Sequence, residues 1–214
     1  MAEDLVQALH KRGVTGALGV GHSLGGVLTL WAAIEDPQLF RAVVLIEPVI
    51  LPPFWLWTLR LMRALGLRQR QPFVQVALRR RRTWPSLQAC FAHLRSKPLF
   101  GAWSDEALRD YVHSGTRPAP GDQVELVYPP EWEAHIFATT PLAIWRDVPR
   151  LQCSVLVIRG AESRTFLPAA QMRMARLLPH ARFTTIAGTG HLVPFERPQE
   201  TAGAIQAFVE SLDA

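Results

Sequence analysis

The stretch Gly21-His22-Ser23-Leu24-Gly25-Gly26 decides the expected fold. The short apolar run 15–20 precedes it, and the apolar, helix-compatible residues 27–34 follow it. This order predicts a strand, a tight turn and a helix. In the pattern G-x-S-x-G, the glycines permit a sharp turn that lifts the central serine into the open above the strand end. We therefore expect Ser23 to be a nucleophile, and the alternative is a glycine-rich packing turn with Ser23 as a helix cap.

A histidine follows the last expected strand, residues 181–186, in the stretch Gly188-Thr189-Gly190-His191. A loop at this point would present an imidazole at the same sheet edge as Ser23. An unassisted hydroxyl is a poor nucleophile at neutral pH, and an imidazole removes its proton as attack proceeds. We expect His191 to be this base, and the amide of Leu24, at the start of the helix after Ser23, to hold an oxyanion.

Strands and helices alternate at both ends of the chain, which predicts a parallel sheet flanked by helices. The further expected strands are 40–46 and 154–158, and the further expected helices are 3–12, 168–178 and 199–212. Between them lie helical patterns at 54–67, 73–82, 84–94 and 104–113, with a turn-rich loop at 115–121. We expect an α/β core made of residues 1–51 and 150–214, with a helical insertion at 52–149.

The composition and the order of the residues argue against a nucleic-acid-binding protein, a membrane-inserted protein and a disulfide-linked protein. The net charge of +5 comes almost wholly from arginine, and many of the arginines are crowded between Arg60 and Arg95. A solvated face explains such a cluster better than a nucleic-acid partner does. The most apolar stretch, 42–62, is interrupted by charges and prolines, so no membrane insertion is expected. Cys90 and Cys153 are expected to be free thiols. The start of the chain is not that of a signal peptide, so a cytoplasmic location is expected.

The two chemical motifs resemble those of a known family. GHSLGG at 21–26 resembles the nucleophile elbow of the α/β-hydrolase family, and GTGHLVPFERP at 188–198 resembles its histidine loop and final helix. The resemblance implies an α/β-hydrolase fold in which the insertion 52–149 is a cap that selects the substrate. It also implies a serine hydrolase, esterase- or lipase-like, that acts through a Ser-His-acid triad and an acyl-enzyme on an ester-like or other carbonyl group of a small molecule. No metal or organic cofactor is expected.

The acid of this triad stays open. The family usually places it three or four residues beyond the glycine that ends the strand before it, and here those positions are Ser163 and Arg164, after Gly160. Glu162 lies one residue short of that slot. Glu47 ends the strand after the elbow helix, a slot from which some branches of the family supply the acid. Asp147 is a weaker third candidate.

The resemblance also implies several strands before the elbow, where this chain has only residues 1–21. We expect the first strands of the fold to be missing, because of a truncated product or misplaced start codon, or because a partner chain supplies them. Bare strand edges favour association, so a homo-oligomer formed through the exposed edge of the sheet stays open. The alternative function is a noncatalytic binding or interaction protein on a truncated hydrolase scaffold.

Overall fold

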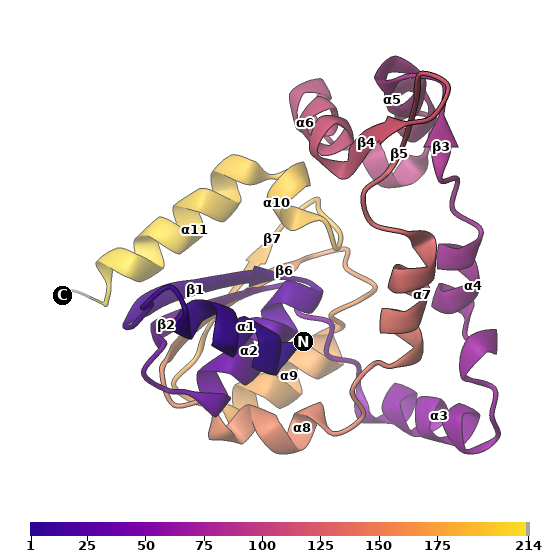
Figure 1. Cartoon of the computed structure of the whole chain (residues 1–214). Coiled ribbons are helices and arrows are strands. Elements are labelled where there is room, and N and C mark those ends of the chain that lie inside the picture. Colours follow the sequence, from indigo (N-terminus) through magenta and orange to yellow (C-terminus); the bar gives the residue numbers. More distant parts are fainter. Residues whose placement is uncertain (213–214) are drawn as a thin grey trace. The chain divides into compact units, whose positions relative to one another are not determined.

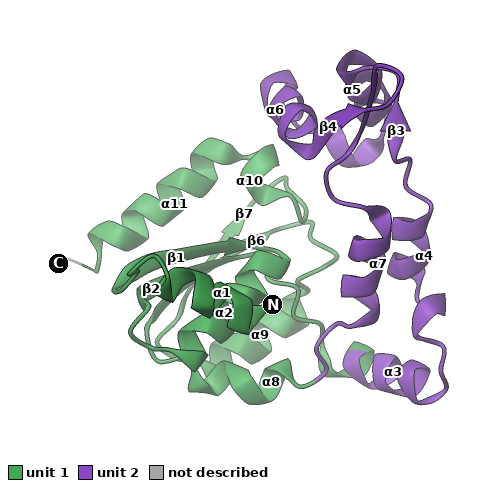
Figure 2. Cartoon of the chain, in the orientation of Figure 1, with its two compact units in different colours: residues 1–55, 143–214 green, residues 56–142 purple. Residues whose placement is uncertain are grey.

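The computed structural model describes residues 1–212, which divide into two compact units (Figure 2). Unit 1 joins Met1–Trp55 to the segment that begins at Ala143, and unit 2 comprises Leu56–Leu142. Unit 2 therefore lies within the segment 52–149 that the sequence sets apart as an insertion. The chain leaves unit 1 after its second strand and returns before its third.

Unit 1 is built on a parallel sheet, as predicted. Its strands lie in the order β1-β2-β6-β7, and each pairs in parallel with its neighbour. They are β1 (Ala17–His22), β2 (Phe40–Ile46), β6 (Ser154–Gly160) and β7 (Arg182–Ile186). All but one of the residues of β2 are buried, as expected for a central strand covered on both faces.

The register aligns the carboxyl ends of these strands. His22, the last residue of β1, pairs with Ile46, the last residue of β2. Ile46 in turn pairs with Ile158 of β6. The residues that follow these ends, Ser23 after β1 and Glu47 after β2, therefore leave the sheet at the same level.

Helices cover both faces of this sheet (Figure 1). One face buries Val44, Ile46 and Ile158 against Phe208 in α11. On the other side of the sheet, α2 packs on β1 and β2. The helices of unit 1 are α1 (Ala2–His10), α2 (Leu24–Glu35), α8 (Ile144–Asp147), α9 (Pro168–Leu177), α10 (Val193–Glu196) and α11 (Pro198–Glu210), with a 3-10 turn η3 (Val148–Arg150).

Unit 2 combines helices with a small antiparallel sheet. Its helical segments are α3 (Pro53–Ala64, which starts before the unit boundary), η1 (Arg68–Arg70), α4 (Pro72–Leu78), α5 (Leu87–Arg95), η2 (Pro98–Phe100), α6 (Asp105–Gly115) and α7 (Pro130–Ala138). Its sheet has the order β3-β5-β4, formed by β3 (Thr83–Trp84), β4 (Thr116–Ala119) and β5 (Gln123–Leu126). The helices α4 and α7 share a core in which Val74 and Ala77 face Ala134 and Ala138.

The small sheet corrects one prediction. The turn-rich loop expected at 115–121 was wrong, because Thr116–Ala119 forms β4 and pairs with β5. The turn between them lies at Gly121 and Asp122, which both have a positive φ, 73° and 57°. Pro118 is unusual within a strand because it lacks an N–H, but β4 is at the edge of its sheet, where a proline is tolerated.

None of the helices within residues 1–212 combines the length and apolar character that a membrane span requires. Cys90 and Cys153 are both free, as predicted.

Candidate active site

Ser23 stands between the end of β1 and the start of α2 with an unusual backbone conformation. Its φ of 57° and ψ of −120° lie outside the regions that non-glycine residues ordinarily occupy. The glycines around it make this turn sterically feasible. A Cβ on Gly21 would lie 2.4 Å from the carbonyl oxygen of Gly25, so only glycine lets the helix start this close to the strand.

His191 is presented to Ser23 by the loop that follows β7. Its Nε2 lies 2.9 Å from Oγ of Ser23, across 168 positions of the sequence. For the serine hydroxyl to donate to Nε2, the imidazole must carry its proton on Nδ1. The predicted nucleophile and base are therefore brought within hydrogen-bond distance.

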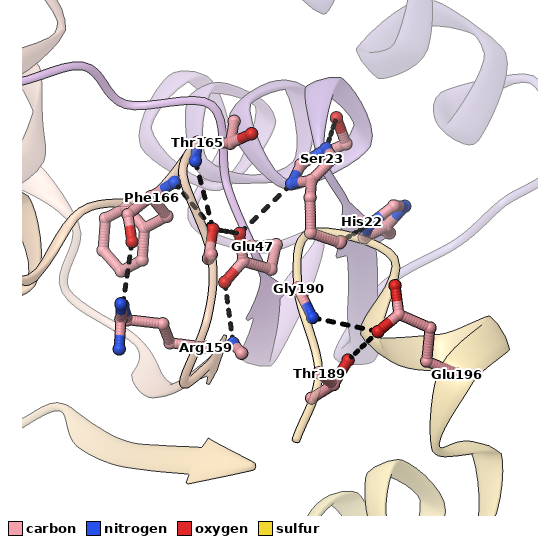
Figure 3. A network of polar contacts seen from close by, with 12 residues as sticks. His22, Ser23, Glu47, Arg159, Thr165, Phe166, Thr189, Gly190 and Glu196 are labelled. Atoms are coloured by element: carbon pink, nitrogen blue, oxygen red, sulfur yellow. Dashed lines mark hydrogen bonds and ion pairs between the residues drawn. The ribbon is translucent and has the colours of Figure 1, made fainter. Parts of the chain in front are cut away.

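Glu47 accepts hydrogen bonds on both carboxylate oxygens (Figure 3). Nδ1 of His191 lies 3.1 Å from Oε2, and the amide of Gly160 donates to Oε1 at 2.7 Å. Oε2 also accepts from the hydroxyl of Ser163. The side chain of Glu47 is 0% exposed. A buried carboxylate is tolerated only with such partners, so this glutamate belongs to an organised site.

The other acid candidates lie elsewhere. Glu162 is exposed, and its backbone amide, rather than its carboxylate, contacts the histidine loop by donating to the carbonyl oxygen of Thr189 at 3.0 Å. Asp147 accepts from the indole of Trp31 at 3.1 Å. Of the acids left open by the sequence, Glu47 is the one that the structure brings to His191.

Leu24 is the first residue of α2 and follows Ser23 directly. The first amides of a helix have no acceptor within it, and the helix dipole adds a partial positive charge there. The amide of Leu24 is thus suited to an anionic oxygen that forms beside Ser23.

Two residues that hold the histidine loop in place, Glu196 and Gly160, were not predicted from the sequence as parts of the site. Glu196 accepts from the hydroxyl of Thr189 at 2.7 Å and from the amide of Gly190 at 2.9 Å (Figure 3). Gly160 lets the loop approach β6, because a Cβ there would lie 2.1 Å from the carbonyl oxygen of Gly190. The signal was present in the stretch 188–198, which contains Thr189, Gly190 and Glu196.

His22 braces the same loop from the elbow side. Its Nε2–H donates to the carbonyl oxygen of His191 at 2.8 Å. Burial lowers the pKa of His22 below its ordinary value of 6.5, and the hydrogen bond to His191 only partly opposes this. His22 is therefore a neutral hydrogen-bond donor at neutral pH.

Comparison with known proteins gives consistent matches. The sequence model of the alpha/beta hydrolase family matches residues 1–204. The chain is 31% identical over 204 residues to the pimeloyl-[acyl-carrier protein] methyl ester esterase of Xanthomonas axonopodis pv. citri (strain 306), covering 92% of this chain and 72% of that protein. It is 26% identical over 230 residues to the abhydrolase domain-containing protein AFT2-1 of Alternaria alternata, covering 90% and 82%. Among solved structures, E-2-(acetamidomethylene)succinate hydrolase has a similar fold, with a TM-score of 0.75 and 24% identity over 98% of this chain and 72% of that chain.

Proposed function

Because the chain belongs to the α/β hydrolase family, we propose that it is a serine hydrolase that cleaves an ester-like carbonyl group through an acyl-enzyme. The observation that carries the proposal is the continuous chain of contacts from Ser23 through His191 to Glu47, with distances of 2.9 and 3.1 Å. This order of hydroxyl, imidazole and buried carboxylate is the arrangement that activates a serine for acyl transfer.

Acylation begins at the hydroxyl of Ser23. As Oγ attacks the substrate carbonyl, Nε2 of His191 accepts the hydroxyl proton, and the carbonyl π electrons move onto the oxygen. Glu47 holds Nδ1–H and stabilises the imidazolium that results. The new oxyanion forms beside the first turn of α2, where the amide of Leu24 can donate to it. The oxyanion then re-forms the carbonyl, the bond between the acyl carbon and the leaving group breaks, and the imidazolium gives its proton to the leaving group, so the acyl group stays on Ser23.

Deacylation uses the same residues. His191 takes a proton from water, the hydroxide equivalent attacks the acyl carbon, and the imidazolium returns the proton to Oγ of Ser23 as the acid product leaves. The balance is one ester and one water converted to one acid and one alcohol. The residues of this relay need no metal or organic cofactor.

Two features favour a carboxylic ester or a related acyl group as the substrate. A serine nucleophile forms an ester when it is acylated, whereas displacement at a carbon–halogen or epoxide carbon needs a carboxylate nucleophile. The 31% identical relative is named as a methyl ester esterase. We assign the choice among acyl substrates to unit 2, which occupies the place in the chain where the resemblance implies a cap.

The test uses a fluorophosphonate probe and a series of p-nitrophenyl esters. We expect the chain to be labelled and Ser23→Ala to lose both labelling and ester hydrolysis, by about 10⁴-fold or more. His191→Gln should have a loss of similar size. Labelling that persists in Ser23→Ala would rule out this nucleophile, and a folded chain that neither labels nor hydrolyses would favour a noncatalytic binding protein.

Glu162 provides a matched control for the assignment of Glu47 as the acid. Glu47→Gln keeps the size of the side chain but removes its charge, and we expect kcat to fall roughly 10³- to 10⁴-fold. Glu162→Gln makes the same change on the exposed acid and should alter kcat by less than about twofold. A larger loss in Glu162→Gln than in Glu47→Gln would reverse the assignment.

A further inference from the structure

The hydroxyl of Ser163 has a hydrogen-bond partner for its proton and for each of its two lone pairs. Ser163 is buried, with 5% of its surface exposed. Its Oγ accepts from the backbone amides of Thr165 at 3.1 Å and Phe166 at 3.2 Å. A serine hydroxyl has one proton and two acceptor lone pairs, and two amide donors fill the lone pairs. The proton of Ser163 therefore has one acceptor, Oε2 of Glu47.

Oε2 is the same oxygen that faces Nδ1 of His191. The side chain of His191 is 25% exposed and lies on a loop. The other two partners of the carboxylate, Gly160 and Ser163, are the last residue of β6 and a buried residue three positions beyond it. Ser163 and Gly160 thus fix the carboxylate from the sheet side, independently of the histidine.

Glu47 needs these two hydrogen bonds because of its backbone position and the length of its side chain. It reaches His191 from the end of β2 with a long side chain, and its own φ is 47°, a conformation that is rare outside glycine. A glutamate has more rotatable bonds than an aspartate, so hydrogen bonds to both oxygens are needed to restrict its carboxylate to one orientation. Gly160 holds Oε1, and Ser163 holds Oε2.

We infer that Ser163 is a positioning residue, which fixes Oε2 of Glu47 opposite Nδ1 of His191. The inference rests on the proposed function and names a part of its machinery. Ser163 also occupies one of the two positions where the resemblance implies the acid itself. In this chain the loop after β6 contributes a hydrogen-bond donor to the acid, and β2 contributes the acid.

A double-mutant cycle tests this role, because a residue that acts only through Glu47 loses its effect when the carboxylate is gone. We expect Ser163→Ala to lower kcat for a p-nitrophenyl ester by roughly ten- to a hundredfold, the value of a hydrogen bond to a charged group, with KM changed less than about twofold. Added to Glu47→Gln, the same substitution should lower kcat by less than about twofold. An equal fold loss in both backgrounds, or no loss in a folded Ser163→Ala, would overturn the inference.

Graded variants keep the test valid if Ser163→Ala folds poorly. Ser163→Thr retains the hydroxyl and should keep kcat within about threefold, whereas Ser163→Cys keeps a similar size but donates weakly, and its kcat should fall toward the alanine value. A kcat order in which Cys matches Thr would contradict the role of the hydroxyl. Ser211→Ala is the matched control, because the hydroxyl of Ser211 also donates a hydrogen bond, to the carbonyl oxygen of Phe208 at 2.6 Å, but does so at the C-terminal end of α11. It should lower the melting temperature without lowering kcat.

Two results distinguish a failure of the proposed function from a failure of the positioning role of Ser163. If the wild-type chain shows no labelling that depends on Ser23, the proposed function fails and the inference with it. If that labelling is normal and Ser163→Ala leaves its rate and kcat unchanged, only the positioning role of Ser163 fails.

Discussion

Glu196 holds the loop that carries the base. Its carboxylate accepts from the hydroxyl of Thr189 and the amide of Gly190, the two residues before His191. We predict that Glu196→Ala leaves both donors unpaired, lowers the free energy of unfolding by about 1–3 kcal/mol, and lowers kcat roughly tenfold or more as Nε2 of His191 loses its alignment. Urea unfolding and ester kinetics on the same preparations measure the two effects.

Glu200 provides the control for this substitution. It lies on α11, is 56% exposed, and pairs with Arg197 at 3.8 Å. Exposed pairs of this kind contribute little, so Glu200→Ala should change stability by less than about 0.5 kcal/mol and leave kcat unaltered. If Glu196→Ala behaved like Glu200→Ala, the loop would be held by other contacts.

At this scale the sequence predicted the residues whose motif is local. Ser23 and His191 lie in short patterns that can be recognised within a few positions, and the structure brings them together. The acid was left between Glu47 and Glu162, because which carboxylate reaches the imidazole depends on strand register and loop direction. Those are properties of the sheet and not of any one stretch of sequence.

At the level of secondary-structure elements, the close approach of β1 and α2 predicts that a side chain at Gly21 destabilises the fold. A Cβ on Gly21 would lie 2.4 Å from the carbonyl oxygen of Gly25 and 2.6 Å from Oγ1 of Thr29. The oxygen belongs to the backbone and cannot turn away, so Gly21→Ala must push α2 off the strand. We expect a loss of about 2–4 kcal/mol in the free energy of unfolding.

Gly25→Ala is the comparison for Gly21→Ala in the same motif. A Cβ on Gly25 meets nothing within 4 Å. Gly25 lies inside α2, where alanine is favoured over glycine by up to about 1 kcal/mol. Urea unfolding should therefore show opposite signs for the two substitutions, and a similar destabilisation by both would contradict the steric argument.

The elements themselves were predicted unevenly. The strands of unit 1 and its helices α1, α2, α9 and α11 have apolar patterns with clear ends, and they formed near the predicted places. The short helices α8 and α10 were not predicted. In unit 2, β4 was missed because Pro118 interrupts it, and the pattern around Pro129 and Pro130 did not predict α7. Short elements that depend on tertiary packing, such as α7 against α4, carry weak local signals.

For the molecule as a whole, the alternating pattern predicted that both ends of the chain build one parallel sheet, with an insertion between β2 and β6. The order β1-β2-β6-β7 was not predicted, since periodicity does not say which strands are neighbours. Within the described residues β1 and β7 are the outer strands of that sheet. Association of two copies through a sheet edge therefore stays a prediction.

The lowered pKa of His22 makes the stability of the whole fold depend on pH. Because the folded state holds His22 neutral, the unfolded state binds more protons once the pH falls below the ordinary value of 6.5. The free energy of unfolding should therefore fall as the pH drops from 6.5 toward the lowered pKa, whereas above 6.5 the contribution of His22 should not change with pH. His22→Gln retains a donor for the carbonyl oxygen of His191 but cannot be protonated. Urea unfolding at several pH values between 7.5 and 5 should show the stability advantage of the wild type over His22→Gln shrinking as the pH falls. A difference that stays constant over this range would mean that His22 titrates alike in the folded and unfolded states.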